Sequence, residues 1–197
     1  EKQAKGAVLL NADLAASALS TQALSASDFK AKLDWNGTIE GWIDAFALTA
    51  KADGRIDAGR MRFADNRVEQ AVWTAPVLDV KLQRGPRAGS DSFSWRVEGA
   101  HSLSAARGDV AGFSGRNVRL TSSSLVAGGR DDTFEARGPL RLQMAQAEGY
   151  DLSLRQLDGQ LKLDVLRDTL THVSLAGSLN SASSQYNGLG RATAQDA

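Results

Sequence analysis

Residues 157–179, LDGQLKLDVLRDTLTHVSLAGSL, contain two runs in which apolar and polar residues alternate, separated by a short polar break. The apolar members lie on one side of each run: Leu161, Leu163 and Val165, then Val173, Leu175 and Gly177. A period of two places successive side chains on opposite faces of a β-strand. The stretch therefore predicts two strands of a sheet with one apolar face, and something must cover that face.

The same alternation recurs along the chain. Further candidate strands cover residues 8–14, 29–35, 44–52, 66–74, 77–83, 92–98, 116–122, 133–146 and 149–155. Residues 15–27, AASALSTQALSAS, leave helix and strand both open, because Ala and Leu favour helix. Since no other segment is typical of a crossover helix, the pattern predicts an all-β chain with an elongated, curved, mainly antiparallel sheet. A β-sandwich is the alternative fold.

Turn signals separate many of these runs. Asn36-Gly37, Asp53-Gly54, Asp158-Gly159 and Asn187-Gly188 are dipeptides that accept the positive φ angles of a tight hairpin turn. We therefore predict a hairpin turn at each of these places.

Composition narrows the possible functions. The 197 residues carry 23 Lys and Arg against 23 Asp and Glu, so no net charge favours a nucleic-acid partner. Cysteine is absent, which excludes disulfides and thiolate metal sites. No window approaches the roughly 20 apolar residues of a spanning helix. Because the first residue is not Met, we expect a fragment or processed form of a longer protein.

Motifs with catalytic or metal chemistry are weak. The segment around Ser114, GFSGR, lacks the spacing of a nucleophile elbow, and we expect Ser114 in a loop. His101 and His172 are far apart in sequence, so the spacing does not predict a metal site or an acid–base pair. The acidic pair Asp131-Asp132 is typical of a solvated turn and lacks the pattern of a calcium-binding loop. We predict no enzyme activity, no metal site and no cofactor.

A resemblance to a known family extends the prediction from the fold to the function. The segments LDWNG (33–37), ALTAKADGRI (47–56), LRQLDGQLKLD (154–164) and VSLAGSL (173–179) resemble the bacterial AsmA-like repeating β-groove proteins, most of all the YdbH-like group. The similarity extends from about Gly6 to Gly190. It is carried by Asp-Gly dipeptides and alternating Leu rather than by a catalytic signature.

The resemblance implies a taco-shaped sheet with an apolar groove, in which residues 1–197 form a single segment of a longer, membrane-anchored chain. Such proteins are anchored in the inner membrane and carry phospholipid across the periplasm towards the outer membrane. The implied partners are phospholipid acyl chains, the membrane through parts outside this sequence, and an outer-membrane lipoprotein. The residues expected to bind lipid are Phe29, Leu33, Trp35, Phe93, Trp95, Val97, Leu161, Leu163, Val173 and Leu175.

A second interpretation remains open at this point. A structural or adhesive β-domain of a secreted or surface protein would also show alternating strands and turns rich in Ser, Gly and Asp. It would bury the apolar face against a second sheet instead of a lipid. The two interpretations therefore differ in what covers Leu161, Leu163 and their neighbours.

Overall fold

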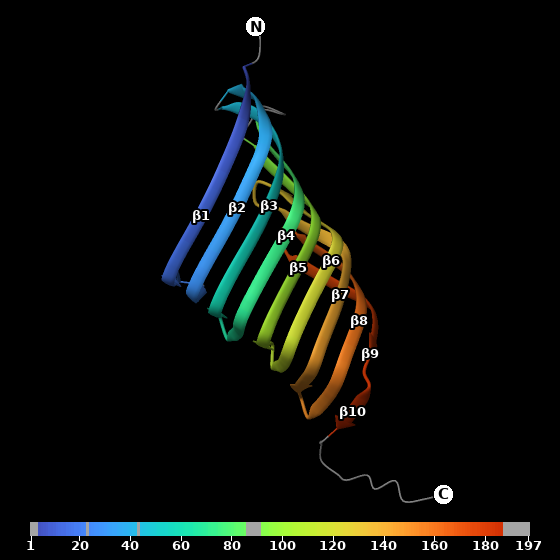
Figure 1. The fold of residues 1–197 in the computed structure, drawn as a ribbon. Helices are drawn as coiled ribbons and strands as arrows, with labels where there is room; N and C mark the ends of the chain where they lie inside the picture. Colours follow the sequence, from blue (N-terminus) through green and yellow to red (C-terminus); the bar gives the residue numbers. More distant parts are fainter. Residues whose placement is uncertain (1–3, 23, 43, 86–91, 187–197) are drawn as a thin grey trace, which may run out of the picture.

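The strands form one open antiparallel sheet (Figure 1). The computed structural model describes residues 4–22, 24–42, 44–85 and 92–186. Its strands are β1 (Lys5–Ser20), β2 (Leu24–Trp42), β3 (Ala45–Phe63), β4 (Asn66–Arg84), β5 (Phe93–Val110), β6 (Phe113–Arg130), β7 (Phe134–Gly149), β8 (Leu152–Arg167), β9 (Thr171–Asn180) and β10 (Ser183–Tyr186). Strands β1 to β8 follow one another across the sheet in chain order.

The two edges of the sheet do not meet. Strand β1 pairs only with β2, while β9 and β10 both pair with β8, at different places along it. Among the described residues, every substantial strand contact joins hydrogen-bonded neighbours. The predicted antiparallel, curved sheet is therefore confirmed, and the described strands form neither a sandwich nor a closed barrel. Residues 15–20 belong to β1 and residues 24–27 to β2, so the helix considered for 15–27 is wrong.

The predicted turns are mostly wrong. Asn36-Gly37 lies inside β2, Asp53-Gly54 inside β3 and Asp158-Gly159 inside β8, while Asn187-Gly188 lies outside the described residues. Residues 66–74 and 77–83, expected as separate strands, are the two halves of β4. The strands are longer than predicted because bulges interrupt their alternation without ending them.

One line of residues with a left-handed backbone crosses the sheet at a constant level. The residues Ser27, Arg60, Glu69, Arg107, Arg116, Gln146 and Arg155 oppose one another in register from β2 to β8. In each even-numbered strand the next residue has a left-handed φ near 50°: Asp28, Gln70, Asn117 and Gln156. No residue is extra at these positions: Glu69 and Ala71 of β4, for example, oppose Arg60 and Ala58 of β3, so the register does not change. The four left-handed residues therefore interrupt the extended backbone of the sheet at one level without a register shift.

A second set of irregularities crosses the middle strands. Register shifts occur between Ala52 and Gly54, between Thr74 and Leu78, between Gly99 and His101, and between Thr121 and Val126. Pro76 lies in the second of these shifts, where a missing N–H is tolerated. Figure 1 shows the result as a staggered row of curved strands.

Candidate functional site

Most apolar residues of the long strands lie on one face of the sheet, here called the apolar face. Two rows of directly opposed residues cross it from β1 to β9 without a polar member. The first row is Val8, Gly37, Ala50, Val80, Val97, Ala127, Ala136, Val165 and Val173. The second is Leu14, Ala31, Ile56, Trp73, Leu103, Leu120, Leu142, Gly159 and Leu179. At about 4.8 Å per strand, each row runs for about 38 Å.

All ten residues expected to bind lipid lie on the apolar face. Their cross-strand partners are apolar or glycine in almost every case; for example, Trp95 lies between Leu82 and Gly129, and Leu163 between Gly138 and Leu175. The exception is Phe93, opposite Arg84 at a strand end. The sequence alternation thus placed these side chains on the correct face, although the bulges separate them into blocks.

Burial on the apolar face falls from its centre to its edges. A buried cluster on β3 and β4 contains Leu48, Ala50, Ala52, Ala75, Leu78 and Val80, and Val80 retains only 2% of its accessible surface. At the edges, Leu10 is 45% exposed and Val173 is 66% exposed. Because no described segment lies over this face, the central side chains are sheltered by their own neighbours and by the curvature of the sheet. The apolar side chains towards the edges are exposed to water, and this exposure costs free energy.

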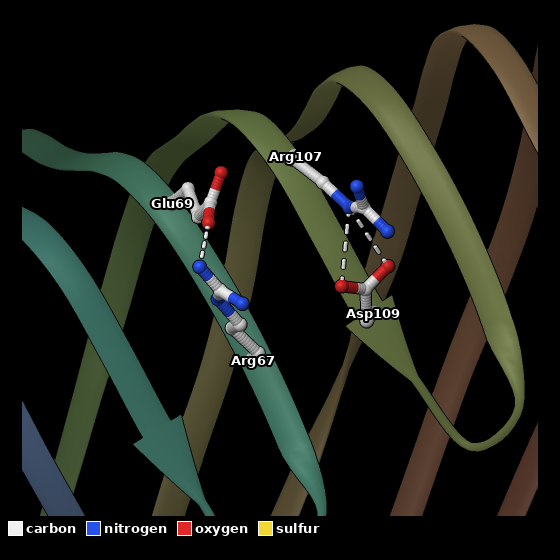
Figure 2. Close-up of polar contacts among 4 residues, drawn as sticks. All are labelled: Arg67, Glu69, Arg107 and Asp109. Atoms are coloured by element: carbon white, nitrogen blue, oxygen red, sulfur yellow. Dashed lines mark hydrogen bonds and ion pairs between the residues drawn. The ribbon is translucent and has the colours of Figure 1, made fainter.

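The opposite face is polar and carries ion pairs along and between the strands. Arg67 pairs with Glu69 on β4, and Arg107 Nε donates to both carboxylate oxygens of Asp109 at 3.1 Å on β5 (Figure 2). A hydrogen bond from Ser114 and the charges of Arg107 and Arg67 lower the pKa of Asp109. Since the opposite charges neutralise each other within the Arg67–Glu69 pair and within the Arg107–Asp109 pair, this face is typical of a solvated sheet surface.

The motifs with possible catalytic or metal chemistry remain scattered. Ser114 lies in β6 beside Asp109, not in the predicted loop, because β6 begins at Phe113 directly after the turn. Asp131 lies in the β6–β7 turn, where its carboxylate accepts a hydrogen bond from the Phe93 N–H. Among the described residues, no group of three His, Cys, Asp or Glu side chains is arranged to hold a metal ion.

The apolar face carries two polar residues that the sequence analysis did not assign to it. His101 of β5 lies directly opposite Ser122 of β6, and the ring of His101 lies 5.8 Å from the ring of Trp73. The face of Ser122 could not be predicted, because an extra residue between Ser122 and Leu125 interrupts the alternation of β6. The alternation of β5 is unbroken from Val97 to Leu103, and this spacing was the available signal for His101.

Comparison with known proteins identifies no relative. No family model matches the chain, and neither the curated proteins nor the solved structures include a significant match. Within the described part of the chain, no helix is long and apolar enough to cross a bilayer.

Proposed function

We propose that the apolar face binds the acyl chains of phospholipids, and that the chain is a non-catalytic segment of a periplasmic lipid-transport protein. The observation that carries the proposal is the pair of unbroken apolar rows, which run from β1 to β9 with no described segment of the chain over them. Burying each methylene of an acyl chain contributes roughly 0.8 kcal/mol. A long apolar row can therefore hold a chain without a specific headgroup contact.

The resemblance to the AsmA-like repeating β-groove proteins, in particular the YdbH-like group, supports the wider role. On this proposal the segment belongs to a chain anchored in the inner membrane, and it passes phospholipid towards the outer membrane with an outer-membrane lipoprotein as a further partner. Rows that reach both edges of the sheet suit such a role, because a lipid can enter or leave where the edge side chains are exposed.

The proposal predicts that the purified chain carries phospholipid. Mass spectrometry of an organic extract should detect it above the level in a matched soluble protein. A folded sample without lipid above that level would contradict the proposal.

Two neighbouring substitutions test where the lipid binds. Leu163 is half-buried on the apolar face, whereas Lys162 is exposed on the polar face of the same strand. Leu163→Glu should remove lipid while the sheet stays folded, because an open face lets water reach the carboxylate. Lys162→Glu should keep both lipid and fold. Circular dichroism and lipid quantification on both variants give the answer, and equal lipid in the two variants would exclude this face.

A further inference from the structure

The apolar face contains one polar position in its interior. Away from the strand ends, the described strands from β1 to β9 place one ionisable side chain on it, His101, and one hydroxyl group, that of Ser122. They oppose each other directly across β5 and β6. Two residues further along each strand, Leu103 and Leu120 also oppose each other and belong to the second apolar row. The polar pair therefore lies beside a continuous apolar row.

The hydrogen-bond donors of this pair have no acceptor among the described residues. His101 has no hydrogen-bond partner among the described residues, and burial lowers its pKa, so the imidazole is neutral near pH 7. The Ser122 hydroxyl oxygen accepts one bond, from the Ser124 N–H at 3.3 Å, which leaves its own proton free to donate. Ser122 is buried. Polar groups left unpaired in apolar surroundings cost free energy that a ligand could recover.

We propose that His101 and Ser122 together bind an oxygen at the polar end of an acyl lipid whose chain lies along the apolar row through Leu103 and Leu120. This inference rests on the proposed lipid-binding function and adds to it a polar contact that sets the position of the lipid along the row. The imidazole N–H and the serine hydroxyl are both donors, and they suit an oxygen acceptor. That acceptor is an ester carbonyl or a carboxylate, and the polar pair would stop the chain from sliding freely along the row.

The two histidines of this chain make the test direct. His172 lies on β9 opposite Leu166, is exposed, and serves as an internal control. In protein labelled with ¹⁵N at its histidines, 1-monolauroylglycerol should shift the imidazole nitrogens of His101 and leave those of His172 unchanged. Laurate separates the two acceptors, because a carboxylate bound to His101 moves both its nitrogens towards the imidazolium positions, whereas an ester does not.

A double variant, His101→Leu with Ser122→Ala, provides a second test of the polar site. Tryptophan fluorescence should show about tenfold weaker binding of 1-monolauroylglycerol, the loss expected for two ordinary hydrogen bonds. Dodecane, which has no oxygen, should bind the double variant and the parent equally. His172→Gln should change neither affinity, and circular dichroism confirms that each variant is folded.

The outcomes separate this inference from the proposed function. Dodecane binding combined with an unchanged His101 signal on addition of monolauroylglycerol would overturn the polar site and leave the acyl-chain proposal intact. Equal affinity of parent and double variant for monolauroylglycerol would do the same. If neither ligand binds the folded parent, the proposed function fails and the inference fails with it.

Discussion

Arg141 of β7 holds the carboxylate of Asp158 on β8 in a two-point contact, with Nε 3.2 Å from Oδ1 and Nη2 2.7 Å from Oδ2. The hydrogen bond from Arg141 lowers the pKa of Asp158 below its usual value. The ionised carboxylate is therefore stabilised more in the folded sheet than in the unfolded chain. That contribution is present above the unfolded pKa of about 4 and is lost as the pH falls through the lower folded pKa.

We expect Asp158→Asn to lower the thermal midpoint slightly at pH 7 and to have no effect at a pH below the folded pKa. The effect should be small, because the pair is exposed and is screened by salt. Asp164→Asn is the matched control, since Asp164 lies on the same face of the same strand without an ion pair. Thermal denaturation across pH and salt measures both. A deficit that persists unchanged in strong acid would contradict the assignment.

The line of left-handed residues predicts that glycine stabilises the sheet at some of its positions. Gln70 and Asn117 both have a left-handed φ, at 51° and 50°, where a Cβ costs about 1–2 kcal/mol. Glycine removes this strain but adds about 0.5–1 kcal/mol of chain entropy cost. Gln70→Gly should therefore stabilise the sheet by about 0.5–1 kcal/mol, measured by urea denaturation. Asn117→Gly should gain less, because asparagine tolerates this conformation better than glutamine.

A neighbouring position provides the control for this prediction. Arg119 is exposed on the same strand as Asn117 and has ordinary strand geometry. Arg119→Gly should destabilise the protein by about 0.5–1 kcal/mol. If Gln70→Gly destabilises the protein by the same amount, Gln70 does not have a strained left-handed backbone.

The alternation of residues determined which face each strand buries, but not where the strands turn. Leu161, Leu163, Val173 and Leu175 were assigned correctly because the pairing of β8 with β9 has no register shift. In β4, between Ala75 and Leu78, and in β6, between Ser122 and Leu125, one extra residue moves the alternation to the other parity, and a single strand then resembles two shorter ones. Such a shift depends on the partner strands, and no local residue preference specifies it.

The turns were missed for a related reason. Several real turns use non-glycine residues at positive φ, such as Ala64, Ala111 and Tyr150, which carry weak sequence signals. Meanwhile, glycines such as Gly37 occur inside strands, where small size rather than backbone freedom is needed. The His101–Ser122 pair was missed because the extra residue of β6 hides the face of Ser122, although His101 follows the alternation of β5.

A substitution of Gly37 tests most directly whether Asn36-Gly37 lies inside a strand or in a hairpin turn. A Cβ on Gly37 would lie 2.4 Å from the Thr49 carbonyl oxygen and 2.6 Å from the Ala50 Cβ, both on the adjacent strand β3. Backbone at that distance cannot move without disturbing the β2–β3 pairing, so Gly37→Ala should destabilise the sheet by about 1–3 kcal/mol. Asn36→Ala should cost little, because Asn36 is exposed in the middle of β2.

A hairpin turn at Asn36-Gly37 predicts a different pattern, because Asn36→Ala would then cost about as much as Gly37→Ala through the positive φ angles that both positions require. Gly108→Ala controls for glycine loss inside a strand: a Cβ there would meet only Val118 Cγ2, at 4.0 Å. We expect that variant to be neutral or slightly stabilised. Urea denaturation of the three variants ranks them, and a large loss for Asn36→Ala would show that β2 ends at this point instead of continuing to Trp42.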